Sequence, residues 1–209
     1  MRRRGRTLLI VALAAAVGAG VGVAVAVTRA PARAAHARVA HSKLHGQAVW
    51  QPGQKSALPF RLRDQTGRTV SLRSQRGHVV LLAFLDSRCR SACPIDGAQL
   101  GRVWRGLAGP GFDFLVASVD PWADTAASAR AFARRAHWVR GWHWLLGSER
   151  QLRPLWRAYA IAVLKTSTDI VHTRAAYLID RDGNVRSAYL FPFRAGHVVR
   201  DARSLLRAA

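Results

Sequence analysis

Cysteine and methionine are both scarce in this chain of 209 residues. Its two cysteines, Cys89 and Cys93, are too few for a disulfide scaffold, but they are close enough in sequence to form one redox or metal-binding pair. The only methionine is Met1, so no thioether sulfur can serve as a buried metal ligand. Any site for a soft metal must therefore be built from cysteine and histidine.

Acidic residues are also few. Asp and Glu number 11 against 33 Lys and Arg, which gives a formal net charge of +22. Such an excess of positive charge would suit nucleic acid or anionic lipid as a partner. Almost all of the basic residues are arginine, because lysine occurs only at Lys43, Lys55 and Lys165. Hydrophobic residues make up 50% of the chain, which excludes wholesale disorder.

A long apolar run follows a cluster of arginines at the start of the chain. Residues 8–27 carry no charge, and as a helix they would span about 30 Å, the thickness of a hydrocarbon core. We expect residues 1–28 to form an uncleaved signal anchor with the arginines in the cytoplasm, although 32–34 and 35–37 also offer small-x-small cleavage patterns. The protein is then a single-pass protein of the cell membrane with an extracytoplasmic C-terminal domain. Export excludes chromosomal DNA as a partner and leaves the basic surface mainly solvated.

Residues 29–54 are rich in Ala, Arg and His without sustained periodicity, and we interpret them as a tether to a domain at 55–209. Its histidines are expected to be exposed and without a ligand role: His36, His41 and His45. The domain opens with a predicted hairpin, whose strands at 60–63 and 69–72 flank a turn containing Gly67. Residues 79–85 are apolar on both alternating faces, which predicts a central strand buried on both sides.

The rest of the domain alternates between strand and helix. Strands are predicted at 112–119 and at 142–146, the latter a core strand, and a closing hairpin is predicted at 177–180 and 184–190. Helices are predicted to start at Pro94, after Asp124 or Thr125, and behind a capping box at Ser148 and Gln151, and a last helix is predicted at 198–206. This order is typical of a thioredoxin-like α/β sandwich with three layers and an N-terminal hairpin. The cysteines lie where the central strand ends and a helix begins, which is where such sheets place their chemistry.

Both cysteines are expected to be reactive. Cys93 is predicted at the helix N-cap, where free N–H groups and the helix dipole stabilise a thiolate, and Arg88 and Arg90 add positive charge. Both sulfurs should therefore ionise more easily than a free cysteine. The three intervening residues leave room for the sulfurs either to close into a disulfide or to bind an ion, and the spacing alone does not choose between them.

A histidine beside the cysteines would favour a metal site. Soft thiolates suit Cu(I), and an added imidazole gives a Cys₂His set that also tolerates Cu(II). His172 lies in a predicted loop at 165–173, which a thioredoxin-like chain brings back beside the cysteine helix. A surface histidine without a ligand role is the alternative interpretation. The other histidines of the domain begin predicted elements or adjoin tryptophans: His78, His137, His143 and His197.

Three segments resemble the signature blocks of the SCO/SenC family, and they occur in the family's order. The blocks are 84–94 with the two cysteines, 117–125 with Asp120 and Asp124, and His172 ahead of 177–183. The resemblance extends from about residue 58 to the C-terminus. We assign the second block a structural role, because Pro121 fixes a turn after a strand and Asp124 or Thr125 caps the next helix.

The resemblance implies a membrane-anchored, outward-facing copper metallochaperone with a thioredoxin-like fold. Its copper, as Cu(I) or Cu(II), is then expected to be bound by Cys89, Cys93 and His172. The expected partner is the copper-bearing subunit of cytochrome c oxidase, whose dinuclear copper site the family helps to assemble, and a copper donor protein would be another. Some members act as thiol-disulfide reductants for that site. The alternative is therefore an exported thiol-disulfide oxidoreductase that uses only Cys89 and Cys93 as its catalytic redox pair.

Two other classes of protein fit the sequence less well. The peroxide-reactive cysteine of peroxiredoxins lies in a Pro-x-x-x-Thr/Ser-x-x-Cys loop, whereas the position of that proline is Leu82 here. A nucleic-acid binder rests on net charge alone and is opposed by the predicted export segment. We therefore expect no nucleic-acid partner.

Overall fold

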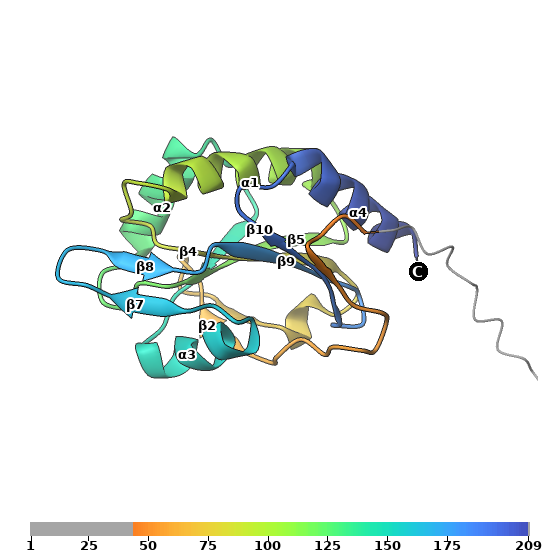
Figure 1. Cartoon of the computed structure of the whole chain (residues 1–209), viewed down its shortest axis with the longest axis horizontal. Helices are drawn as coiled ribbons and strands as arrows, with labels where there is room; N and C mark the ends of the chain where they lie inside the picture. Colours follow the sequence, from red (N-terminus) through yellow and green to blue (C-terminus); the bar gives the residue numbers. More distant parts are fainter. Residues whose placement is uncertain (1–43, 209) are drawn as a thin grey trace, which may run out of the picture. The chain divides into compact units, whose positions relative to one another are not determined.

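The computed structural model describes residues 44–208 (Figure 1). The predicted anchor at 1–28 and the first part of the predicted tether lie outside these residues. Within 44–208, every helix is too short or too polar to cross a bilayer. The described elements are, in order, β1 (Ala48–Val49), β2 (Arg61–Arg63), β3 (Thr69–Ser71), the 3₁₀ helix η1 (Arg73–Gln75), β4 (Val79–Leu85), α1 (Cys93–Leu107), β5 (Phe112–Ser118), α2 (Ala126–Arg135), β6 (Trp142–Leu145), α3 (Glu149–Ala158), β7 (Val163–Lys165), β8 (Ile170–His172), β9 (Ala175–Ile179), β10 (Val185–Leu190) and α4 (Ala195–Arg207).

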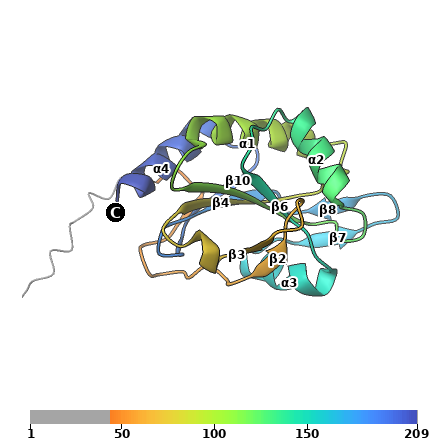
Figure 2. The same cartoon turned by 180° about the vertical axis from the view of Figure 1, so that it is seen from behind.

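A mixed six-stranded sheet forms the middle layer, with the strand order β1-β10-β9-β4-β5-β6. β4 pairs in parallel with β5, and β5 pairs in parallel with β6. On its other side β4 pairs antiparallel with β9, which forms the predicted closing hairpin with β10. Helices α1, α2 and α4 cover one face of the sheet, and α3 lies with β2 and β3 on the other (Figures 1 and 2). The predicted three-layer α/β architecture is confirmed.

β4 contributes to both layers of the core because its side chains alternate. Val79, Leu81, Ala83 and Leu85 belong to the core beneath α1 and α4. Val80, Leu82 and Phe84 belong to the core that α3 and the β2–β3 hairpin cover. All seven residues are buried, as expected of a strand that is covered on both faces. The strand therefore gives the segment that follows it a rigid starting point.

The folded domain begins earlier in the chain than we predicted from the sequence. Leu44 is buried, and β1 pairs with β10 at the edge of the sheet. The ring Nδ1 of His45 lies 2.6 Å from a carboxylate oxygen of Asp201 in α4. Residues 44–54 are therefore part of the domain and not of a tether, whereas the His45 side chain is exposed, as we expected. A two-residue strand is too short to produce a periodic sequence pattern.

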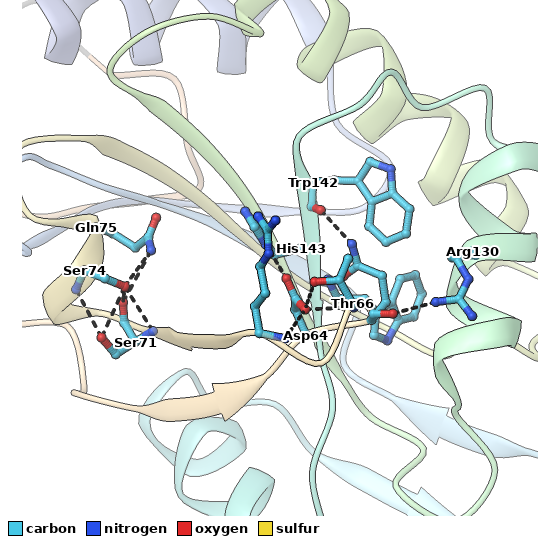
Figure 3. A network of polar contacts seen from close by, with 11 residues as sticks. Asp64, Thr66, Ser71, Ser74, Gln75, Arg130, Trp142 and His143 are labelled. Atoms are coloured by element: carbon cyan, nitrogen blue, oxygen red, sulfur yellow. Dashed lines mark hydrogen bonds and ion pairs between the residues drawn. The ribbon is translucent and has the colours of Figure 1, made fainter.

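β6 contributes the buried Trp144 and Leu145 to the core, as predicted, and it forms one edge of the sheet. Gln65, in the turn between β2 and β3, pairs with its exposed edge: Nε2 donates to the carbonyl of Trp142 at 3.0 Å, and Oε1 accepts from the N–H of Trp144 at 2.7 Å. Arg130 of α2 donates to the Gln65 carbonyl at 2.6 Å (Figure 3). Unpaired edge strands invite pairing with other chains, so this side-chain contact protects the edge of the sheet.

Candidate metal centre

The two cysteines lie in the connection between β4 and α1. Cys93 is the first residue of α1 and Pro94 follows it, so the N-cap residue is Ala92, one position before our prediction. The N–H of Cys93 donates to Cys89 Sγ at 3.4 Å. The first N–H of the helix therefore serves the sulfur of Cys89 and not that of Cys93. Both residues are free thiols, with exposed fractions of 8% for Cys89 and 1% for Cys93.

The two thiols differ sharply in acidity. A hydrogen bond from the Cys93 thiol, together with one from Ser91, lowers the pKa of Cys89 to about 5 against the opposing effect of burial. The same hydrogen bond to Cys89, reinforced by burial, raises the pKa of Cys93. Our expectation that both sulfurs ionise easily is therefore wrong for Cys93. At neutral pH the metal-free pair consists of a Cys89 thiolate and a Cys93 thiol.

His172 lies at the end of β8 and directly beside the cysteines. The predicted loop is in fact a hairpin, in which β7 and β8 pair antiparallel and His172 lies opposite Val163. Its ring atom Nε2 is 3.7 Å from Cys93 Sγ, although the two residues are separated by 79 positions in the sequence. The fold thus places His172 beside Cys93, whose thiol is in turn hydrogen-bonded to Cys89.

The hydrogen bonding of the His172 ring determines which nitrogen can bind a metal. Nδ1 lies 2.9 Å from the carbonyl oxygen of Thr173. Since a carbonyl only accepts hydrogen bonds, Nδ1 carries the proton, and Nε2 presents a lone pair towards Cys93. Burial lowers the pKa of His172, so the ring is neutral at neutral pH. Such an arrangement is typical of histidine ligands, whose second nitrogen is held by a carbonyl or carboxylate.

An ion pair connects the link between β8 and β9 to the first turn of α1. Arg174 donates from Nε to a carboxylate oxygen of Asp96 at 2.7 Å and from Nη2 to the other oxygen. The Asp96 side chain is completely buried, and that of Arg174 is 33% exposed. This two-point contact holds the segment that carries His172 against the helix that carries Cys93. The sequence does not single out either residue, because an acid in the first turn of a helix is common and does not indicate its partner.

Three carboxylates, from Asp86, Asp120 and Asp124, lie beside the cysteine loop with oxygen atoms within 4.8 Å of one another. Burial raises the pKa of Asp86 to about 6 and that of Asp124 to about 7. Asp124 accepts from the N–H of Ser87 at 2.9 Å and so ties the cysteine loop to the start of α2. Thr125 caps that helix. These contacts agree with the structural role that we predicted for the second sequence block.

The donor set at the site suits a soft or borderline metal ion. Two thiol sulfurs and one neutral imidazole nitrogen form the Cys₂His combination that Cu(I), Cu(II) and Zn²⁺ accept. The same two sulfurs, without a metal, form a dithiol with one ionised and one protonated member. The geometry is therefore compatible with metal binding and with thiol-disulfide exchange.

Comparison with known proteins places this site in a family. The SCO1/SenC family model matches residues 50–207. A SCO1 protein homolog of Bacillus subtilis (strain 168) is 27% identical over 151 residues, which is 69% of this chain and 78% of the relative. Among solved structures, Bradyrhizobium japonicum ScoI with copper bound is 25% identical, with a TM-score of 0.63 over 72% of this chain and 99% of that one. A SCO1/SenC family lipoprotein from Bacillus anthracis is 22% identical, with a TM-score of 0.67 over 76% and 99%.

The family match covers three quarters of the chain and includes both cysteines, His172 and every strand of the six-stranded sheet except β1. The shared fold with the two solved structures extends over nearly the whole of each. The chain therefore belongs to the SCO1/SenC family.

Proposed function

We propose that this protein is a copper metallochaperone that holds one copper ion through Cys89, Cys93 and His172. The observation that carries the proposal is the approach of His172 Nε2 to within 3.7 Å of Cys93 Sγ from a segment 79 positions away. A dithiol exchange site needs no imidazole there. Copper as the metal is supported by the two soft sulfur donors and by the B. japonicum relative, which was solved with copper bound.

We further propose that the copper passes to the copper-bearing subunit of cytochrome c oxidase and arrives from a copper donor protein. The domain would face outward from the cell membrane, held by a single-pass anchor at residues 1–28 and a tether that ends before Leu44. Support comes from the apolar run at 8–27 and from the B. anthracis relative, which is described as a lipoprotein. An anchored chaperone meets a membrane-embedded acceptor in two dimensions, which raises the effective concentration of each for the other.

A copper titration tests the proposal. The full-length chain is purified in a non-ionic detergent, reduced, freed of metal and titrated with Cu(I) against a competing chelator, with Zn²⁺ added in a parallel series. We expect one copper per chain, and Cys89→Ser or Cys93→Ser should each lower the affinity by at least about 100-fold, since each removes one of two soft ligands. The matched loop variant Ser91→Ala should keep full stoichiometry. Wild-type affinity in either cysteine variant would contradict the ligand assignment.

Oxidation provides a second test of the same ligands. Closing a disulfide between Cys89 and Cys93 commits both sulfurs, so neither can act as a thiolate donor. The oxidised chain should therefore fail to bind Cu(I), and reduction should restore binding. Equal uptake by the oxidised and reduced forms would show that the cysteines are not the ligands.

The second candidate function is thiol-disulfide exchange by the same cysteine pair. The observation that favours it is the unequal acidity of the thiols, because a Cys89 pKa of about 5 supplies a thiolate nucleophile at neutral pH while Cys93 keeps its proton. His172→Ala separates the two functions. Copper binding should weaken in this variant, whereas a dithiol oxidoreductase should keep its rate of disulfide reduction.

A further inference from the structure

A cavity of about 480 Å³ opens beside Cys89. It is lined by Cys89, by two serines, Ser87 and Ser128, and by three arginines, Arg88, Arg90 and Arg135. Cys93 does not line it. Within the part of the chain that the structure describes, no acidic side chain contributes to its wall. The volume falls in the range of sites for small molecules, about 300–1,000 Å³.

The three arginines give this cavity the character of an anion site. Guanidinium groups stay charged at every relevant pH and bind carboxylates through two parallel hydrogen bonds. Arg135 of α2 is held in place, because its Nη2 donates to the carbonyl of Ser87 at 3.4 Å and its guanidinium lies 6.0 Å from the ring centroid of Phe132. Arg88 and Arg90 flank Cys89 directly in the sequence. A negatively charged molecule that enters the cavity is thus drawn to the sulfur.

We propose that this cavity binds small disulfides that carry carboxylates and that Cys89 reduces them when the site is free of metal. The Cys89 thiolate attacks one sulfur of the bound disulfide, a new S–S bond forms between them, and the other half leaves as a thiolate. Cys93 then attacks Cys89 Sγ, the second half leaves, and the proton of the Cys93 thiol ends on a released thiolate. The substrate gains two electrons and the Cys89–Cys93 pair loses them.

The size and the exposure of the site favour a small substrate over a folded acidic protein. Only 8% of Cys89 is accessible, so a reacting sulfur must enter the cavity to reach it. Cys89 is also a copper ligand in the proposed function. This activity rests on the proposed function in one respect: copper and the disulfide would compete for the same sulfur. Charge then decides which disulfides react: anionic ones are attracted and cationic ones are repelled.

The experiment measures how charge affects the first step. The full-length Cys93→Ser variant stops at the mixed disulfide, whose formation is followed by mass spectrometry under metal-free conditions. Three probes are compared: glutathione disulfide, which is anionic, bis(2-hydroxyethyl) disulfide, which is neutral, and cystamine, which is cationic. Each rate is divided by the rate of the same probe with free mercaptoethanol. We expect the normalised rate of the anionic probe to exceed that of the neutral probe by at least about 10-fold, and cystamine to have the lowest normalised rate.

Salt and substitution provide the controls. The preference should shrink towards unity in 1 M salt, where the screening length is about 3 Å. In the Cys93→Ser background, the triple variant Arg88→Gln/Arg90→Gln/Arg135→Gln should abolish the preference for the anionic probe. Removing three exposed arginines outside the cavity should preserve it; this matched control is Arg102→Gln/Arg134→Gln/Arg140→Gln. The salt arm needs no arginine substitution and so does not depend on the folding of the triple variant.

Either of two results would overturn the inference. One is no preference for glutathione disulfide at low salt. The other is an equal loss of preference in both triple variants, which would show that the preference arises from the net charge of the protein and not from the cavity. Copper stoichiometry is measured separately, with Cys93 intact. If the cavity triple variant binds one copper per chain but has lost its charge preference, both proposals stand. If copper binding fails while the preference persists in the Cys93→Ser background, the proposed function falls and the disulfide site stands.

Discussion

The cysteine loop and the β7–β8 hairpin meet at one site, but they are held in very different ways. β4, which leads into the cysteine loop, is the fourth of six strands and is buried at every residue. β7 and β8 have three residues each and, among residues 44–208, pair only with one another. Leu164 and Val171, which lie opposite each other on this hairpin, are 63% and 58% exposed. The sulfurs are thus supported by the central sheet, and the imidazole by a ribbon with one face in solvent.

Contacts at the base and near the turn hold the hairpin in place. At the base, the N–H of Thr173 donates to the carbonyl of Ala162 at 2.9 Å, and the next residue, Arg174, forms the ion pair with Asp96. Near the turn, the Lys165 ammonium lies 4.8 Å from the ring centroid of Trp122. Because the hairpin depends on these few contacts, a substitution that removes one of them should displace the imidazole and leave the sulfurs in place.

The largest effect that we expect in this comparison comes from Arg174→Ala. The substitution leaves the Asp96 carboxylate buried without its cation, which should lower the free energy of unfolding by about 3 kcal/mol. Urea denaturation measures the change. Arg153→Ala, which breaks a surface ion pair with Glu149, is the matched control and should cost less than about 1 kcal/mol.

A double variant tests the cause of that loss. Asp96→Ala/Arg174→Ala removes both charges, so it should be more stable than Arg174→Ala alone, since no buried carboxylate remains unpaired. If the double variant is as unstable as the sum of the single ones, the two side chains do not act as a pair, and the hairpin is held by its backbone contacts.

His172→Ala removes the imidazole that the hairpin supplies to the site and leaves the two sulfurs of the cysteine loop. Two thiolates can still hold Cu(I) in near-linear geometry, whereas Cu(II) loses a nitrogen donor that it prefers. We expect the thiolate-to-Cu(II) charge-transfer band to disappear and Cu(I) binding to persist in part. Burial lowers the pKa of His172, so acid should weaken wild-type copper binding through this ring only below its ordinary range near pH 6.5. An unchanged Cu(II) spectrum would remove His172 from the site.

The acidity of Cys89 can be read from alkylation of the reduced, metal-free chain. Its pKa is lowered to about 5, so the thiolate is present above that pH and is lost as the pH falls through it. The rate with iodoacetamide should be nearly constant from pH 8 to 6 and halve near pH 5, while the unfolded chain gives a midpoint of about 8.5. Cys93→Ala removes the main hydrogen bond and should move the midpoint upward. A wild-type midpoint near that of the unfolded chain would contradict the thiol–thiolate pair.

The smallest effect is expected at the turn of the hairpin. Lys165→Met removes the contact with Trp122, which is worth about 0.5–1 kcal/mol, and should speed amide hydrogen exchange in β7 and β8 with little change in global stability. Lys55→Met removes a similar contact with Trp50, at 4.6 Å, and should leave exchange in the hairpin unchanged. Equal exchange in both variants would show that the Lys165 contact does not restrain the hairpin.

Much of the scaffold could be predicted from the sequence because it depends on local patterns. The uniformly apolar run at 79–85 predicts a strand covered on both faces, and the closing hairpin predicted at 177–180 and 184–190 is formed by β9 and β10. The junction of that first strand with a helix that starts near Pro94 places the cysteines at the end of the sheet. These features are set by alternation and turn chemistry within a few residues, which any compact fold of this chain must respect.

Only the tertiary structure decided how the site is completed. The contact between His172 and Cys93 and the ion pair between Asp96 and Arg174 each join segments nearly 80 positions apart, and no local pattern specifies which distant residue a side chain will meet. The raised pKa of Cys93 likewise depends on its hydrogen bond to Cys89 and on burial. Periodicity thus determined which strand and helix carry the sulfurs, whereas long-range packing determined their protonation and the imidazole that joins them.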